Sequence, residues 1–285
     1  MATQQKNHVG SILQYALVEN LRSEARPGLK GICATCGAIM VSKCGSRVIH
    51  HWAHASRLEC DPWWENETDW HREWKGRFPP ECREQTRIAP DGEVHRADIV
   101  TPTGVVIEVQ HSAMSDLERR SREAFYQNLV WIVDGRGFRK QFDLHHLLPD
   151  PNDDEAKDLV WFKAARGKHG ANSGVFWRRS ENPDHEPGGM VLVHGSHTIE
   201  HLIATYRGHQ QYTWVKPRRT WLDAQCPVYI DFGDEWLFQL QRYGSNELEC
   251  VYRVSKMKFL HDAMVETQAR DIATRFHPTI GCNAA

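Results

Sequence analysis

The chain has 285 residues, 40% of them hydrophobic, and its 35 Lys and Arg nearly balance 37 Asp and Glu. This composition excludes a disordered chain and a protein that coats nucleic acid through charge alone, since such binders carry a broad basic surface. The sequence contains no apolar run near the roughly 20 residues that span a bilayer and no signal peptide, so we expect a cytoplasmic protein without a membrane association.

The first sixty residues form the first expected segment. Residues 1 to about 28 favour a short strand or helix as a lead-in, which ends at Arg26-Pro27-Gly28. Residues 29–60 are rich in Cys, His and Gly and show little hydrophobic periodicity. Such a segment cannot fold by apolar burial alone, so another source of stability is required.

Cysteine and histidine spacing in this segment predicts a structural zinc site. Eight cysteines are too few for a disulfide scaffold in a chain of this length, and Cys33 and Cys36 form a CATC pair that can bind one side of a tetrahedral ion. His51 and His54 in HHWAH, together with Cys60, offer further ligands at finger-like spacing. Four of these five residues would bind zinc. The alternative is that they are free thiols and solvent-exposed histidines.

Helix and strand patterns alternate after residue 60. Trp and Phe at three- and four-residue spacings predict a helix over residues 63–78, ended by two prolines. Residue 115 is a serine at the expected N-cap of a second helix, in a capping box with Glu118. The order of helix, strands, helix and strand predicts an α/β core. The second helix covers residues 115–128, and strands are predicted at 84–88, 94–100 and 105–110, with a buried strand at 129–133. The strands at 94–100 and 105–110 are joined by TPTG and should form a hairpin.

Acidic side chains in this core point to divalent-metal chemistry. Glu67, His71 and Lys75 recur at four-residue steps and share one face of the predicted helix. Asp98 and Glu108 fall on the two strands of the predicted hairpin, where two ionised carboxylates repel each other unless a cation lies between them. Oxygen ligands of this kind suit Mg²⁺ or Mn²⁺, with Glu67 as a third ligand. The alternative is a structural ion pair between one of the strand carboxylates and an arginine.

The array from residue 33 to residue 134 resembles the competence protein CoiA-like family. Its motifs are CATC, HHWAH, ENETDWHREWK, HRADIV, IEVQHS and REAFY with LVWIVD, and they cover a little over a third of the chain. That family joins a zinc-finger-like segment to a PD-(D/E)XK nuclease domain. The resemblance implies that Glu67 and His71 are the helix pair, that Asp98 is the first strand carboxylate, and that Glu108 with Gln110 is an E-x-Q form of the E-x-K motif.

Gln110 departs from the general nuclease pattern, in which many relatives carry lysine. A glutamine can orient water or phosphate but supplies no positive charge, so Lys75 or His71 is the candidate substitute. Arg122 and Tyr126, one helical turn apart, match the family's helix after the hairpin and are the predicted substrate contacts.

The C-terminal half carries no assignable motif. Residues 149–155, PDPNDDE, predict a polar linker, and residues 156–285 predict a mostly β region with a helix near 259–276. Basic clusters at 119–122, 136–140 and 216–219 are candidates for phosphate contact or solvated surface.

These patterns predict an α/β protein with three parts. They are a lead-in and zinc module at 1–60, a PD-(D/E)XK restriction-endonuclease-like core at 61–148, and a mostly β region at 156–285. The expected function is hydrolysis of DNA with Mg²⁺ or Mn²⁺ and structural Zn²⁺, in DNA uptake, recombination or phage defence alongside other DNA-processing proteins. The alternative is an inactive nuclease fold that binds DNA during processing or recruitment.

Overall fold

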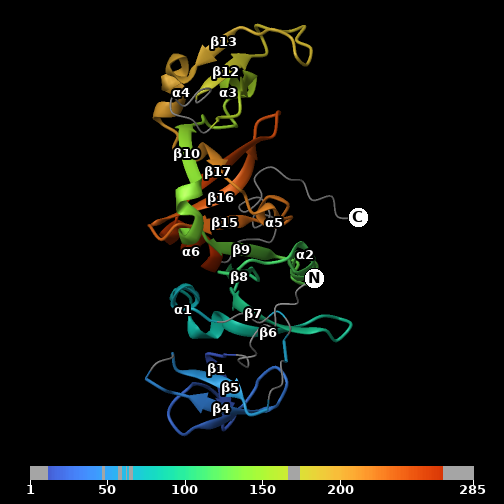
Figure 1. Ribbon diagram of the computed structural model, residues 1–285, viewed down its shortest axis with the longest axis vertical. Helices are drawn as coiled ribbons and strands as arrows, with labels where there is room; N and C mark the ends of the chain where they lie inside the picture. Colours follow the sequence, from blue (N-terminus) through green and yellow to red (C-terminus); the bar gives the residue numbers. More distant parts are fainter. Residues whose placement is uncertain are drawn as a thin grey trace. The chain divides into compact units, whose positions relative to one another are not determined.

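The chain divides into two compact units, residues 1–129 and 130–285, in the computed structural model (Figure 1). The predicted zinc module and residues 61–129 of the predicted nuclease-like core therefore fall in the first unit. The rest of that core, residues 130–148, belongs to the second unit together with the mostly β region. The described residues contain no helix long and apolar enough to cross a membrane. The structure describes residues 12–46, 49–56, 60–61, 63, 67–165 and 174–265.

Unit 1 begins with an antiparallel five-stranded sheet in the order β2-β1-β3-β4-β5. Met40 and Trp52 are fully buried in a small apolar core beneath it, and the Trp52 indole donates to the Ser23 carbonyl (2.9 Å). The segment thus has apolar packing that its composition did not indicate. The strands are β1 (Tyr15–Val18), β2 (Leu21–Glu24), β3 (Lys30–Ile32), β4 (Ile39–Lys43) and β5 (His51–His54).

Helix α1 (Asp69–Gly76) is shorter than the helix predicted over residues 63–78. Its start is fixed by a capping box, in which the Thr68 hydroxyl accepts from the His71 amide (3.3 Å) and the His71 ring accepts from the Thr68 amide (3.4 Å). Trp70 and Trp74 are buried, and α1 packs on β8. After the 3₁₀ turn η1 (Pro80–Cys82), the predicted strands are confirmed as β6 (Arg83–Ile88), β7 (Val94–Val100) and β8 (Val106–Gln110), paired antiparallel.

Helix α2 (Asp116–Phe125) follows the hairpin. As predicted, Ser115 caps it by accepting from the Glu118 amide (3.1 Å). The Glu118 carboxylate pairs with Arg122 (2.6 Å), and this ion pair replaces the second half of the predicted capping box. An arginine of α2 is thereby held in a fixed orientation.

Unit 2 is mostly β, with six strands in the order β10-β14-β17-β16-β15-β9. Only β9 and β15 pair in parallel, and all six residues of β9 are buried, as expected of a strand covered on both faces. The strands are β9 (Leu129–Asp134), β10 (Phe142–Leu147), β14 (His209–Trp214), β15 (Val228–Asp231), β16 (Trp236–Tyr243) and β17 (Leu248–Ser255). Three helical elements accompany them: η2 (Arg136–Gln141), α5 (Arg219–Leu222) and α6 (Lys256–Met264).

A smaller antiparallel sheet completes unit 2, in the order β11-β12-β13. Its core packs Trp161 and Phe176 against Tyr243 and Cys250. The predicted linker at 149–155 contains the start of a short helix, which Asp153 caps. Residues 266–276 of the predicted C-terminal helix lie outside the described residues. The elements are α3 (Asp154–Asp158), β11 (Leu159–Trp161), β12 (Val175–Arg178), β13 (Val193–Gly195), η3 (Ser196–Ile199) and α4 (Glu200–Ala204).

Candidate metal centres

The first candidate centre is a cluster of three cysteines and one histidine. The ligand atoms of Cys33, Cys36, His54 and Cys60 all lie within 4.8 Å of one another. The CATC turn between β3 and β4 closes through a hydrogen bond from the Gly37 amide to the Cys33 carbonyl (2.9 Å), with Gly37 at a φ of +72°. Three thiolates and an imidazole at these positions are consistent with a structural zinc site.

His51 lies outside this cluster, although it was one of the five candidate ligands. Residues three apart on a strand point to opposite faces, and β5 carries both His51 and His54. His54 Nε2 lies 3.4 Å from the Cys36 sulfur, whereas His51 Nδ1 lies 2.7 Å from the Ile49 carbonyl. The strand geometry thus selects the fourth ligand.

Cys33 and Cys60 share a proton in the metal-free cluster, with their sulfurs 3.9 Å apart. The hydrogen bond from Cys60 lowers the pKa of Cys33 to about 4, and the same bond, with burial, raises the pKa of Cys60. The cluster thus favours the thiolate form at Cys33. Metal binding would release the thiol protons that remain on the cysteines.

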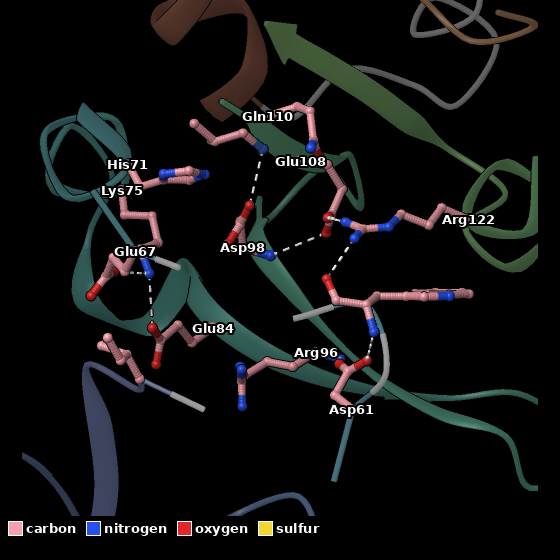
Figure 2. Close-up of a pocket in the computed structure, with 13 residues that line it drawn as sticks. Asp61, Glu67, His71, Lys75, Glu84, Arg96, Asp98, Glu108, Gln110 and Arg122 are labelled. Carbon is pink, nitrogen blue, oxygen red and sulfur yellow. Dashed lines mark hydrogen bonds and ion pairs between the residues drawn. The ribbon is translucent and has the colours of Figure 1, made fainter. Parts of the chain in front are cut away.

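The second candidate centre is a pocket lined by α1, β6, β7, β8 and α2 (Figure 2). Five carboxylates and three permanently basic side chains line it, so the charges of the lining sum to −2 when these eight groups are ionised and His71 is neutral. A pocket of this charge favours a divalent cation over an anionic or apolar ligand. The carboxylates are Asp61, Glu67, Glu84, Asp98 and Glu108, the basic groups are Lys75, Arg96 and Arg122, and His71 and Gln110 also line the pocket.

Asp98 and Glu108 are held side by side by the hairpin. The Asp98 amide donates to Glu108 Oε1 (3.2 Å), and the Val109 amide donates to Asp98 Oδ2 (3.0 Å). Burial, together with the neighbouring Asp98 carboxylate, raises the pKa of Glu108 to about 8, although Arg122 acts in the opposite direction. The pair therefore resists carrying two negative charges unless a further cation is present.

Arg122 binds the far oxygen of Glu108 (2.8 Å), so the structural ion pair that the sequence left open is present. Arg122 also donates to the Trp63 carbonyl (2.5 Å) and to Glu118 (2.6 Å), and it is 4% exposed. Tyr126 is buried as well and is not among the residues lining the pocket. Both predicted substrate contacts are therefore buried. Arg122 lines the pocket, where it pairs with Glu108, and Tyr126 does not line it.

Lys75 points into the pocket from α1 (Figure 2). Its ammonium pairs with Glu67 and with Glu84 (2.8 Å). Burial lowers the pKa of Lys75, but the carboxylates of Glu84, Glu67 and Asp98 outweigh it, so the pKa lies above its usual range. Lys75 is therefore a buried, permanent positive charge beside the acidic pair.

Glu67 precedes α1 and also pairs with Arg72 (2.7 Å). Throughout the described part of the chain, the Cys₃His cluster is the only group of three or more Cys, His, Asp or Glu whose ligand atoms gather within 4.8 Å. Glu67 therefore does not join Asp98 and Glu108 as a third close ligand. The predicted helix stripe does reach the pocket, since Glu67, His71 and Lys75 all line it, but it is buried rather than solvent-exposed.

Gln110 lines the same pocket from β8, two residues beyond Glu108 on the same face, as the strand alternation predicted. Its side-chain amide donates to the Ser112 carbonyl (3.2 Å). His71 is oriented by Thr68, whose hydroxyl lies 3.0 Å from Nδ1. Both side chains thus line the pocket together with the acidic pair.

Glu84 was not predicted as a site residue, and Arg96 was considered only as a possible ion-pair partner of a strand carboxylate. Both lie on strands, in REQTRI and HRADIV, and only the pairing of β6 with β7 brings them to the pocket. Burial raises the pKa of Glu84, but Lys75 and Arg96 outweigh it and hold this pKa at about 2. Its charge is therefore retained, and no local sequence pattern indicated it.

No protein-family model matches the chain, and neither a curated protein nor a solved structure is detectably similar to it. The geometry of the two centres is therefore the basis for a functional assignment.

Proposed function

We propose that the chain is a divalent-metal-dependent nuclease that hydrolyses phosphodiester bonds in DNA, with a core of the PD-(D/E)XK kind. The observation that carries the proposal is a pair of adjacent carboxylates on one hairpin, the partly buried Asp98 and the buried Glu108, with the ammonium of Lys75 beside it. The resemblance of the motif array to the CoiA-like family supports the same assignment and a role in DNA uptake, recombination or phage defence.

The donor set fits Mg²⁺ or Mn²⁺, because these ions take one or two protein carboxylates and leave positions for water and phosphate oxygens. A bound ion would polarise the scissile phosphate and lower the pKa of its water. Asp98 and Glu108 would bind this ion, and Arg122 fixes the orientation of the Glu108 carboxylate. Lys75 supplies the positive charge that Gln110 lacks, and Gln110 offers an amide that orients water or phosphate.

Basic side chains in unit 2 support nucleic acid as the substrate. Two clusters separated in sequence meet there, because the Val215 amide donates to the Gln141 carbonyl (2.8 Å) and the Arg218 guanidinium lies 5.0 Å from the centre of the Phe138 ring. A local cluster of this kind binds backbone phosphates even on a protein with nearly balanced charge. The exposed members are Arg139, Lys140, Lys216 and Arg219, with Arg218 half-buried.

A second candidate function is an inactive nuclease fold that binds DNA. The ion pair of Arg122 with Glu108 favours it, because a carboxylate that is already paired is a weaker metal ligand. Asp98 stands against this second function. Within the part of the chain that the structure describes, its carboxylate accepts a hydrogen bond only from the Val109 amide, and its charge raises the pKa of the neighbouring Glu108.

The discriminating experiment incubates the purified chain with linear, circular and single-stranded DNA and with RNA, in Mg²⁺, Mn²⁺ or EDTA. The nuclease assignment requires cleavage of DNA that depends on the divalent ion. Binding of DNA without cleavage under every condition would replace it with the binding module.

A further inference from the structure

Glu84 has an unusual backbone conformation for a residue inside a strand. Its φ is +44°, in the left-handed region that non-glycine residues rarely occupy. The β6–β7 ladder pairs Arg83 with Ile99 and Gln85 with Ala97, but the intervening position, where Glu84 faces Asp98, is not paired. Strain of this kind persists only where the surroundings enforce it, and it clusters at functional sites.

The Glu84 carboxylate connects the pocket to the Cys₃His module. One oxygen accepts from the Lys75 ammonium (2.8 Å) and from the Gln14 amide (3.1 Å). The other accepts from the Tyr15 amide (3.3 Å). Tyr15 begins β1, a strand of the sheet that carries the cysteine cluster, so a single buried carboxylate joins that sheet to the lysine of the pocket.

Two further connections run from the cluster to the strands of the pocket. Thr35, between Cys33 and Cys36, bonds through its hydroxyl to that of Thr86 on β6 (3.0 Å). Asp61, directly after Cys60, accepts from the Arg96 amide of β7 (2.9 Å). The residues next to the candidate zinc ligands thus contact the two strands that carry Glu84 and Asp98.

We infer that Glu84 is a positioning residue: its carboxylate holds the Lys75 ammonium beside Asp98 and Glu108 and ties that placement to the Cys₃His module. The effect on cleavage rests on the proposed function, whereas the connection itself does not. Like charges at facing positions of two strands repel, so a nearby cation lowers the cost of placing Glu84 opposite Asp98. Lys75 pairs with Glu84 and lines the same pocket as Asp98. The elevated pKa of Lys75 agrees with this arrangement.

The substitution Glu84→Gln, in the zinc-loaded chain of 285 residues, separates positioning from simple stabilisation. A glutamine keeps one acceptor oxygen but presents an NH₂ donor to groups that are themselves donors, so at least one of the three hydrogen bonds is lost. Glu84→Asp keeps the charge and retracts it by one methylene. Glu81→Gln, at an exposed carboxylate in the adjoining turn, is the matched control.

Three quantities are compared among these variants: kcat against KM for DNA cleavage, the NMR signal of the Lys75 ammonium protons, and hydrogen exchange at the Gln14 and Tyr15 amides. In Glu84→Gln we expect kcat to fall about 100-fold with little change in KM, as for a misplaced group near the reacting atoms. The Lys75 signal should disappear, because water then reaches the ammonium, and both amides should exchange faster. Glu84→Asp should recover part of each effect, and Glu81→Gln should match wild type.

The inference is overturned if Glu84→Gln keeps both the wild-type kcat and the Lys75 signal. It is also overturned if Glu84→Asp, while folded, recovers nothing, because the residue would then be only a structural element. If the wild-type chain does not cleave DNA at all, the proposed function fails. The NMR signal of Lys75 and hydrogen exchange at the Gln14 and Tyr15 amides then test by themselves whether Glu84 joins Lys75 to the Cys₃His module. Unchanged NMR and exchange in Glu84→Gln would then refute it.

Discussion

Glu108→Gln distinguishes a metal ligand from a structural ion pair. The rise in the pKa of Glu108 from 4.5 to about 8 corresponds to up to about 5 kcal/mol against its ionised form in the metal-free protein, at ~1.4 kcal/mol per pKa unit. Between these two values the folded chain holds a proton that the unfolded chain releases, so rising pH favours unfolding across this window. A glutamine mimics the protonated acid, and its carbonyl can still accept from Arg122.

We therefore expect Glu108→Gln to be at least as stable to urea as wild type at pH 6 without added divalent ion, because wild type has by then lost about 2 kcal/mol of stability to ionisation of the unfolded chain. Raising the pH to 9 in buffer without added divalent ion, with the zinc retained, should destabilise wild type but not the variant, and Mg²⁺ should restore wild type alone. Breaking an essential buried ion pair costs about 3–5 kcal/mol. A loss of that size at pH 6 would show that Glu108 serves chiefly as the partner of Arg122, and the metal assignment would be wrong.

Three further substitutions test other parts of the account. Cys36→Ser should lower the zinc content and make unit 1 protease-sensitive, because metal binding contributes to its folding free energy, and full zinc content by elemental analysis would contradict this. Gln110→Ala should slow single-turnover cleavage about 10- to 1000-fold, as expected for a lost positioning hydrogen bond, and a wild-type rate would make the residue structural. Lys216→Glu with Arg218→Glu should raise the KM for DNA and reduce the slope of log Kd against log salt by about 2, and an unchanged slope would exclude the basic cluster as a DNA contact.

The elements predicted best are those with a local pattern. The hairpin of β7 and β8 followed from apolar alternation on either side of TPTG, and Ser115 was placed correctly as the cap of α2. The start of α1 was predicted too early, because the capping box of Thr68 with His71 overrides the aromatic spacing that extends back to Trp63. Strands β10, β14 and β17 were not predicted. Polar residues interrupt the alternation in β10 and β14, whereas β17 does alternate, with apolar residues at Leu248, Cys250, Tyr252 and Val254, and this pattern was overlooked.

The candidate site residues likewise divide into those with a local sequence pattern and those that only the fold brings together. Cys33 and Cys36 were evident from their spacing, whereas the choice of His54 over His51 depended on the fact that both lie on a strand. Asp98 and Glu108 were found because charge inside apolar strands is unusual. Glu84 could not be found, because its surroundings come from β1, α1 and β7, and a polar strand such as REQTRI gives no sign of a buried carboxylate.

The most direct test of the central claim compares wild type with Asp98→Asn, purified in parallel, for cleavage of DNA at saturating Mg²⁺. Asparagine keeps the shape of the side chain and an acceptor for the Val109 amide, but it removes the negative charge that binds the ion. The account predicts cleavage by wild type that EDTA abolishes, and at least a 1000-fold lower rate in the variant, on the order of the loss of an essential catalytic group. Equal cleavage by the two proteins would contradict it.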